Sequence, residues 1–240
     1  MTRLSRNAWK TFLFLIGILT LLREDALALT SLDSIPTENV KKERYFRPAA
    51  IIVPTTFLVY GCLKPVISGI ENLDTRIWEN INNNHPDFYT TADDYLQWAP
   101  SASVYLMDAF KVKTKHSFKE HLLIDAGSII ITGGAGYVMR KISGNIDEYN
   151  THGTWFPSGH TANAFRGAEI VFQELKDRNR VLSYSGYLVA TAVGVLRIYN
   201  KQHLLSEVLA GAGLGMLSTK LTYLVFDKVK AHKKKKTLAP

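Results

Sequence analysis

The chain has 240 residues, a net charge of +8, a sequence pI of about 9.4 and a single cysteine, Cys62. This length suffices for one sizeable core or one membrane bundle. A lone cysteine excludes an intrachain disulfide and a metal site built on several thiolates. The positive charge is compatible with nucleic acid, anionic lipid or an anionic substrate, and the mean hydropathy of −0.03 is low for a multispan membrane protein.

The first 30 residues resemble an export signal. Basic residues (Arg3, Arg6 and Lys10) precede an apolar run at 11–22, and Ala26 to Ala28 offers a cleavage site. An uncleaved anchor or a peripheral helix is the alternative. Residues 1–30 are therefore predicted to be a signal-like or anchor segment.

Six mainly apolar segments follow a polar linker at 31–47. They lie at residues 48–66, 93–110, 121–139, 160–175, 182–199 and 203–225. Their lengths favour helices over strands, and the chain contains no repeats. We therefore expect one all-α domain at 48–226, a six-helix membrane-associated bundle, followed by a basic tail at 227–240.

Charges and small residues interrupt these segments. Four charged side chains lie inside apolar runs: Asp125, Arg166, Glu169 and Lys220. Segment 93–110 is the weakest span because it carries Asp93 and Asp94, and it is our candidate for a helix lying in the membrane interface. The small-residue clusters GGAG at 133–136 and GAGLG at 211–215 would let helices approach closely.

Basic residues are distributed unevenly between the segments. One alternate set of gaps contains Lys41, Lys42, Arg44, Arg47, Lys111, Lys113, Lys115, Lys119, Lys176, Arg178, Arg180, Lys228, Lys230 and Lys233 to Lys236. The other set contains Lys64, Arg76, Arg140, Lys141 and Lys201. This alternation is typical of a membrane bundle whose basic loops are cytoplasmic. It argues against nucleic-acid binding, since no reading motif accompanies the lysines; a soluble or peripheral bundle resting on anionic lipid is the alternative.

Two histidines begin predicted helices on the lysine-poor side. His160 ends the stretch FPSGH, and His203 lies within LRIYNKQHLLSE. Glu207 follows His203 by four residues, so both face one side of a helix. The carboxylate would accept a hydrogen bond from Nδ1–H of His203, which fixes the tautomer and leaves Nε2 as a nucleophile. Arg197 would supply a fork of donors to a phosphate oxygen.

The stretch FPSGH itself predicts an anion site. Ser158 and Gly159 would place a hydroxyl and unpaired N–H groups at a helix N-terminus. His160 would then protonate a leaving oxygen. A serine before a helix is usually only a cap, so it is the joint occurrence with Arg197 and His203 on one face that favours a phosphate site.

These motifs resemble those of the type 2 phosphatidic acid phosphatase superfamily, which includes vanadium haloperoxidases. PSGHT and the pattern Arg-(x)5-His-(x)3-acid carry the resemblance, which covers residues 48–225 and is nearest to bacterial cell-envelope members. It implies a helical bundle, a phosphohistidine intermediate, no metal and no cofactor. It also implies a lipid phosphate as substrate, in a bacterial cell membrane with the site facing the periplasm or exterior. His203 would be the nucleophile, Glu207 its orienting group and His160 the acid, with Arg197, Ser158 and Gly159 binding phosphate.

The chain departs from the family pattern in three places. Leu196 stands where the family has Ser, and Glu207 where it has Asp. The first motif, Lys-(x)6-Arg-Pro, has lost its Arg-Pro, and Arg140 or Lys141 would have to replace its lysine. The lost Arg-Pro leaves open a pseudophosphatase that binds lipid phosphate without turnover. The low mean hydropathy and the signal-like start leave open a soluble, nonspecific acid phosphatase, located as a peripheral protein in the periplasm.

Overall fold

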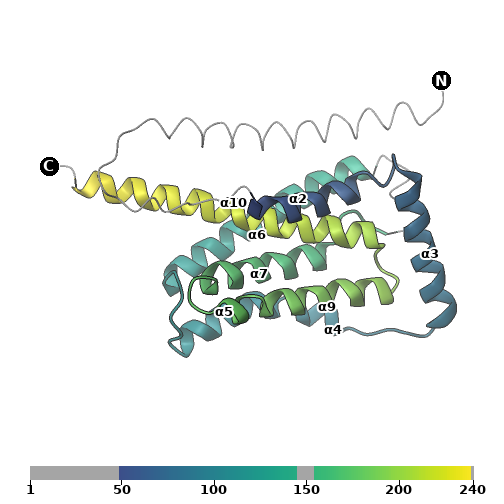
Figure 1. The fold of residues 1–240 in the computed structure, drawn as a ribbon, viewed down its shortest axis with the longest axis horizontal. Helices are drawn as coiled ribbons and strands as arrows, with labels where there is room; N and C mark the ends of the chain where they lie inside the picture. Colours follow the sequence, from purple (N-terminus) through teal and green to yellow (C-terminus); the bar gives the residue numbers. More distant parts are fainter. Residues whose placement is uncertain (1–48, 145–153, 239–240) are drawn as a thin grey trace, which may run out of the picture. The chain divides into compact units, whose positions relative to one another are not determined.

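The computed structural model describes residues 49–144 and 154–238, and within these ranges it contains helices and no strands (Figure 1). The helices are α2 (Ala49–Cys62), α3 (Ser68–Asn84), α4 (Ala92–Leu96), α5 (Ala99–Ala109), α6 (Phe118–Ser143), α7 (Gly159–Leu175), α8 (Arg180–Ser183), α9 (Ser185–Tyr199) and α10 (Leu205–Leu238). The predicted signal-like segment and polar linker lie outside the described residues.

Every predicted apolar segment forms a helix, which confirms the all-α bundle. Segment 93–110 differs, because it divides into α4 and α5 around Trp98, with Pro100 in the first turn of α5. Proline is well placed there because the first turn needs no N–H donor. The predicted basic tail continues α10 as far as Leu238. α3 lies in a stretch that the sequence pattern left as a gap.

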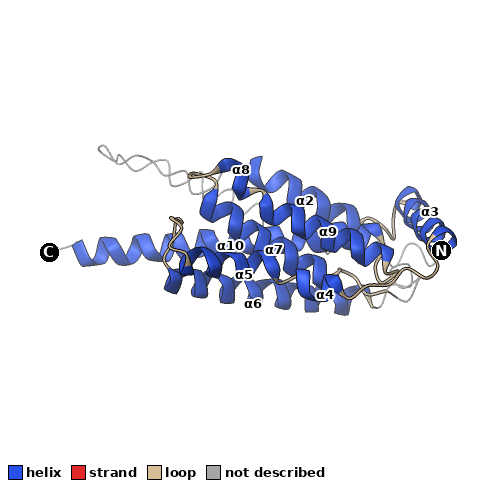
Figure 2. Ribbon diagram, turned by 90° about the horizontal axis from the view of Figure 1, so that it is seen from below, coloured by secondary structure: helices blue, strands red, loops and turns tan. Residues whose placement is uncertain are grey.

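The central helix of the bundle is α7. It packs against α5, α6, α9 and α10, and most of its residues are buried (Figure 2). Phe165 and Ala168 on α7 meet Val193 on α9 and Met216 on α10 in one apolar cluster. Both histidine motifs are attached to this core, since α7 follows one and α10 follows the other.

Glycines bring α10 into backbone contact with its neighbours. A Cβ on Gly211 or Gly215 would meet a backbone oxygen of the α7 region, that of Ser158 at 2.4 Å or Ala162 at 2.1 Å. Close approach was therefore predicted correctly for GAGLG. In GGAG, a Cβ on Gly136 would meet the Leu214 side chain of α10 at an ordinary 3.6 Å, but a Cβ on Gly133 or Gly134 would meet nothing within 4 Å, so these two glycines face no neighbouring helix.

The charged residues inside the bundle are paired. Arg166 on α7 bonds Asp125 and, at 2.9 Å, the Ser128 hydroxyl, both on α6. Lys220 on α10 lies 2.6 Å from Glu169 on α7. Burial of a charge is tolerated when a partner compensates it, so these residues cross-link α6, α7 and α10.

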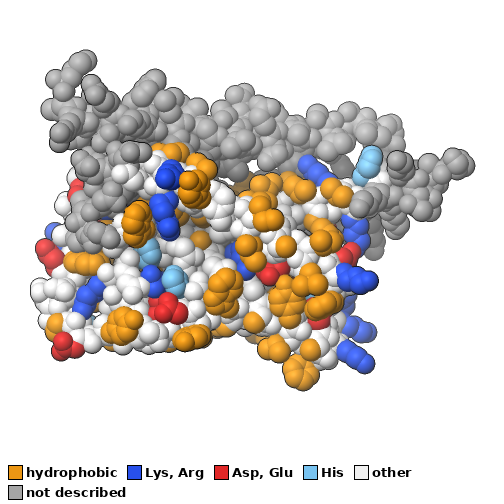
Figure 3. Space-filling model, turned by 180° about the vertical axis from the view of Figure 1, so that it is seen from behind, with side chains coloured by type: hydrophobic (Ala, Val, Ile, Leu, Met, Phe, Trp, Pro, Cys, Tyr) orange, Lys and Arg blue, Asp and Glu red, His pale blue; other side chains and the backbone are white. Residues whose placement is uncertain are grey.

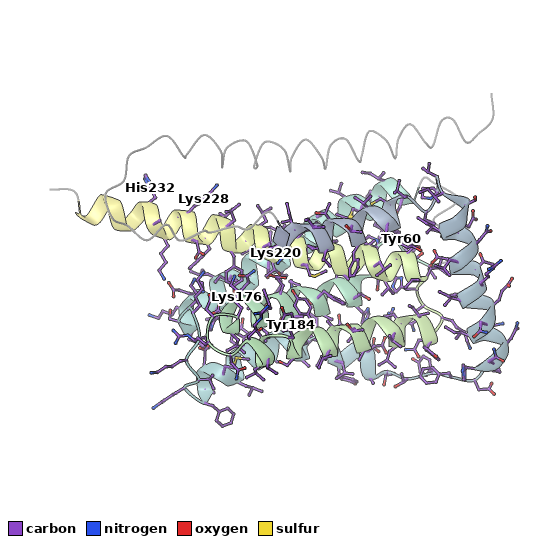
Figure 4. All side chains as sticks on the ribbon, viewed as in Figure 1. Tyr60, Lys176, Tyr184, Lys220, Lys228 and His232 are labelled. Atoms are coloured by element: carbon purple, nitrogen blue, oxygen red, sulfur yellow. The ribbon has the colours of Figure 1, made fainter. Side chains whose placement is uncertain are left out.

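Lys220 and Lys176 share an aromatic neighbour. Both are labelled in Figure 4, and each ammonium nitrogen lies 5.9 Å from the centroid of the Phe172 ring. Such cation–π contacts stabilise partly desolvated lysines. Lys176 belongs to the lysine-rich set of gaps, so this contact lies toward the lysine-rich end of the bundle.

Three helical stretches are long and apolar enough to cross a membrane: Phe118–Ser143, Arg180–Tyr199 and Leu205–His232. α6 carries a row of exposed apolar side chains: Leu122, Leu123, Ile129, Ile130, Tyr137 and Val138. Figure 3 shows hydrophobic side chains spread over the middle of one face of the molecule. Apolar surface of this extent is unfavourable in water, and it supports a membrane location.

Candidate phosphate site

The site lies where α7 and α10 begin, at the end of the bundle that also holds the α9–α10 connection (Figure 1). The N–H of Ser158, the N-cap of α7, donates to the carbonyl of Glu207 in the first turn of α10 at 3.1 Å. This bond joins the two predicted motifs, which are far apart in sequence. Figure 3 shows histidine, basic and acidic side chains gathered toward one end of that face.

His203 and Glu207 form a buried pair. Nδ1 of His203 lies 2.8 Å from Oε2 of Glu207, and the Glu207 side chain is 0% exposed. Because a carboxylate only accepts, Nδ1 carries the proton and Nε2 is left with its lone pair. Thr154 donates to Oε1 of Glu207 at 2.6 Å, and the N–H of Leu204 donates to Oε2 at 3.2 Å. Three donors therefore fix this carboxylate.

A tight turn presents His203. The backbone N–H groups of Gln202 and His203 both donate to the carbonyl of Arg197, at 3.1 and 3.3 Å. Lys201 has a φ of 57°, a left-handed conformation that is uncommon for a lysine. Beyond the turn, the N–H of Ser206 donates to Asp74 of α3 at 3.0 Å. The nucleophile candidate is thus held by α9, α3 and α10 together.

The guanidinium of Arg197 is oriented by a hydrogen bond to an aspartate. Its Nη1 donates to Oδ2 of Asp93 at 2.8 Å, and Asn200 donates to the other oxygen of Asp93 at 2.9 Å. Nε of Arg197 is buried without a hydrogen-bond partner among the described residues. Buried donors are normally satisfied, so Nε of Arg197 is an exception among the buried polar groups of the described residues.

His160 faces a second aspartate. Its Nε2 lies 2.9 Å from Oδ1 of Asp94, which is itself 3.9 Å from Nη1 of Arg197. Burial and the nearby Arg197 charge lower the pKa of His160, although Asp94 opposes them. His160 lies on α7, which is not among the three candidate membrane spans. Because Asp94 contacts both side chains, His160 and Arg197 lie on either side of the same carboxylate oxygen.

The Ser158 hydroxyl does not cap α7. It pairs with the Thr161 hydroxyl at 2.9 Å, and no side chain caps the helix. A Cβ on Gly159 would meet nothing within 4 Å. The first turn of α7 therefore combines uncapped N–H groups with open space, as an anion site requires.

The two predicted substitutes for the lost first motif lie at the end of α6. The guanidinium of Arg140 stacks on the ring of Trp155, 5.5 Å from its centroid, next to Thr154. Lys141 lies over the Tyr137 ring at 5.6 Å. Arg140 thus reaches the neighbourhood of the site through Trp155. The structure brings together His203, Glu207, His160, Arg197, Ser158 and Gly159.

Sequence reasoning missed four polar residues of the site: Asp93, Asp94, Thr154 and Asn200. The signal for the first two was present, since an acidic pair inside an apolar segment requires partners. Thr154 lies in the connection between α6 and α7, and Asn200 is the C-cap residue of α9, and neither belongs to a sequence motif. Among the described residues, no group of three or more His, Cys, Asp or Glu side chains is arranged to hold a metal ion.

Comparison with known proteins gives two matches. The family model described as the PAP2 superfamily matches residues 83–231. The chain is 29% identical over 234 residues to the lipid A 1-phosphatase of Porphyromonas gingivalis, a match that covers 92% of this chain and 51% of that protein. The chain thus spans about half the length of the curated relative it matches. No solved structure matches it.

Proposed function

The chain belongs to the PAP2 superfamily, and from this premise we propose that it is a membrane phosphatase that hydrolyses a phosphate ester of a lipid. The observation that carries the proposal is the His203–Glu207 pair, 2.8 Å apart and buried, in the same site as His160 and Arg197. A protonated Nδ1 held by a carboxylate makes Nε2 the nucleophile. The curated relative, by its name, acts on lipid A, so a phosphorylated glycolipid is the first substrate to test.

The proposed reaction has two steps. In the first, Nε2 of His203 attacks phosphorus, an N–P bond forms, the P–O bond to the lipid breaks, and His160 gives its proton to the departing oxygen. In the second, His160 takes a proton from water, which attacks phosphorus, breaks the N–P bond and releases inorganic phosphate. Arg197, Ser158 and the first-turn N–H groups at Gly159 would stabilise the charge on the phosphoryl oxygens. No metal ion or cofactor takes part in the proposed steps.

The position of the site within the bundle supports a site that faces the periplasm or the exterior of the cell. At the opposite end of the bundle, the α5–α6 connection carries Lys111, Lys113 and Lys115, and the α7–α8 connection carries Lys176 and Arg178, whereas the described connections at the site end carry few lysines. Basic loops are retained in the cytoplasm. A lipid in the outer leaflet would then reach the site from the membrane plane. The exposed apolar face of α6 argues against the soluble periplasmic alternative.

The test uses the full chain, purified in detergent, with a panel of lipid phosphates that includes a lipid A-type glycolipid, a phosphatidate and a polyprenyl pyrophosphate. We expect phosphate release by the wild type, none by His203→Ala, and labelled phosphohistidine in the quenched wild-type reaction. Equal release by wild type and His203→Ala would overturn the proposal.

A pseudophosphatase is the second candidate. It is favoured by the missing Arg-Pro and by the position of Arg140, which stacks on Trp155. Loss of one such cation is worth about 2–4 kcal/mol, or roughly 10²–10³ in rate. Saturable binding of a lipid phosphate without release from any member of the panel would select this candidate, and a trapped phosphohistidine would eliminate it.

A further inference from the structure

Asp94 lies against two groups that the proposed reaction uses. Its Oδ1 oxygen is 2.9 Å from Nε2 of His160 and 3.9 Å from Nη1 of Arg197. The N–H of the proposed acid and the guanidinium proposed to bind phosphate therefore share one carboxylate oxygen. Phosphate and carboxylate oxygens accept from the same donors. Asp94 thus presents its oxygen where the proposed reaction would place a phosphate oxygen.

The neighbouring aspartate behaves differently. Asp93 is 1% exposed and accepts from both Arg197 and Asn200, so it is fixed. The Asp94 side chain is 50% exposed, and its contact with His160 is its one hydrogen bond to a described residue. Rotation of Asp94 into solvent therefore breaks one hydrogen bond and the 3.9 Å contact with Arg197, whereas rotation of Asp93 would break the 2.8 Å hydrogen bond that holds Arg197.

We propose that the Asp94 carboxylate occupies a phosphate-oxygen position in the substrate-free site and is displaced by the substrate. The inference rests on the proposed function. Two like charges cannot share this position without strong repulsion, so phosphate and Asp94 exclude each other. Nε of Arg197, which has no partner among the described residues, would then gain one from the phosphate.

The experiment measures the affinity of the full-length protein in detergent for inorganic phosphate and orthovanadate by calorimetry. It compares wild type, Asp94→Asn, Asp94→Ala and, as a matched control in the adjacent position, Asp93→Asn. We expect the Asp94 variants to bind both anions at least about 10-fold more tightly. We expect Asp93→Asn to bind them more weakly, because Arg197 loses its orienting contact.

The outcomes separate this inference from the proposed function. Anion binding that is unchanged or weaker in both Asp94 variants, with turnover intact in the wild type, would overturn the inference alone and leave Asp94 as a positioning group for His160. Absence of anion binding by every variant, together with absence of turnover, would overturn both.

Discussion

Thr154 and Glu207 form a hydrogen bond of 2.6 Å in which the threonine hydroxyl donates to Oε1. Glu207 therefore uses one oxygen for Thr154 and the other for His203. The threonine immediately precedes Trp155, on which Arg140 stacks. Two adjacent residues thus contact both Glu207, which is proposed to orient the nucleophile, and Arg140 at the end of α6.

Replacement of Thr154 by valine removes this bond and keeps the shape of the side chain. A hydrogen bond to a charged group contributes about 1.5–3 kcal/mol, so kcat is expected to fall by roughly 10-fold or more. Thr154→Ser keeps the hydroxyl and is the control. Steady-state phosphate release checks the pair, and equal kcat values for valine and serine would refute the role.

Replacement of Glu207 by aspartate restores the residue of the family pattern and shortens the side chain by one methylene. In this chain the longer side chain reaches His203 at 2.8 Å and Thr154 at 2.6 Å simultaneously. A misplacement of about 1 Å in such a group lowers the rate by roughly 10²-fold. We therefore expect Glu207→Asp to be slower than wild type. A kcat equal to or above that of wild type would show that the extra methylene has no role in orientation.

Glycine packing on α10 gives a matched pair of variants. A Cβ on Gly215 would meet the Ala162 carbonyl at 2.1 Å, whereas a Cβ on Gly133 would meet nothing within 4 Å. Gly215→Ala should therefore separate α10 from α7 and lower the thermal midpoint in detergent by several degrees. Gly133→Ala should match or exceed wild type, because alanine favours a helix by about 1 kcal/mol over glycine. Equal midpoints for the two variants would contradict the packing.

The Arg166–Asp125 pair is expected to be essential for stability. Arg166 is 1% exposed, and Arg166→Met would leave Asp125 without its guanidinium partner. Breaking a buried pair from one side destabilises by about 3–5 kcal/mol. The double variant Arg166→Met/Asp125→Leu removes both charges and should recover much of that loss. Unfolding followed by circular dichroism in detergent measures both, and a single variant as stable as wild type would show that the pair is dispensable.

The stability of the protein is expected to depend on pH through His116, which lies in the connection between α5 and α6. Burial alone would lower the pKa of His116, but hydrogen bonds to Asp227 and Glu174 outweigh it and raise the pKa to about 9. A pKa above the unfolded value of about 6.5 means that the stabilisation is complete below pH 6.5. It is lost as the pH rises through 9. We expect the thermal midpoint to fall over this range, and less steeply in His116→Gln.

The motifs around the starts of α7 and α10 allowed most of the candidate site to be predicted, because they are short and continuous in sequence. The His203–Glu207 contact was expected between two residues of one helix, but His203 lies in the turn before α10, which begins at Leu205, and Glu207 reaches it from the first turn of that helix. Ser158 was correctly placed before a helix. The contribution of α4 was not predicted, since the contacts of Asp93 and Asp94 cross more than sixty positions of sequence. Hydrophobic periodicity carries no information about such pairings.

The helices of the fold were also predicted in part. The apolar runs gave the helices of the bundle, but α3 has a polar composition and its role depends on Asp74, which holds the start of α10. GGAG and GAGLG look alike in sequence, yet only the second faces backbone at close range. Which face of a helix meets a neighbour is decided by the tertiary packing, and small residues on α6 and α10 do not by themselves reveal it.

The cross-links of α7 also balance its charges. Arg166 compensates Asp125 on α6, while Glu169 is compensated by Lys220 on α10. Without α10, Glu169 would keep its hydrogen bonds from Gln173 and Tyr187 but would lose its lysine partner. The last helix of the chain therefore supplies the counter-charge of the central one, and the charges of α7 are balanced only when α10 is in place.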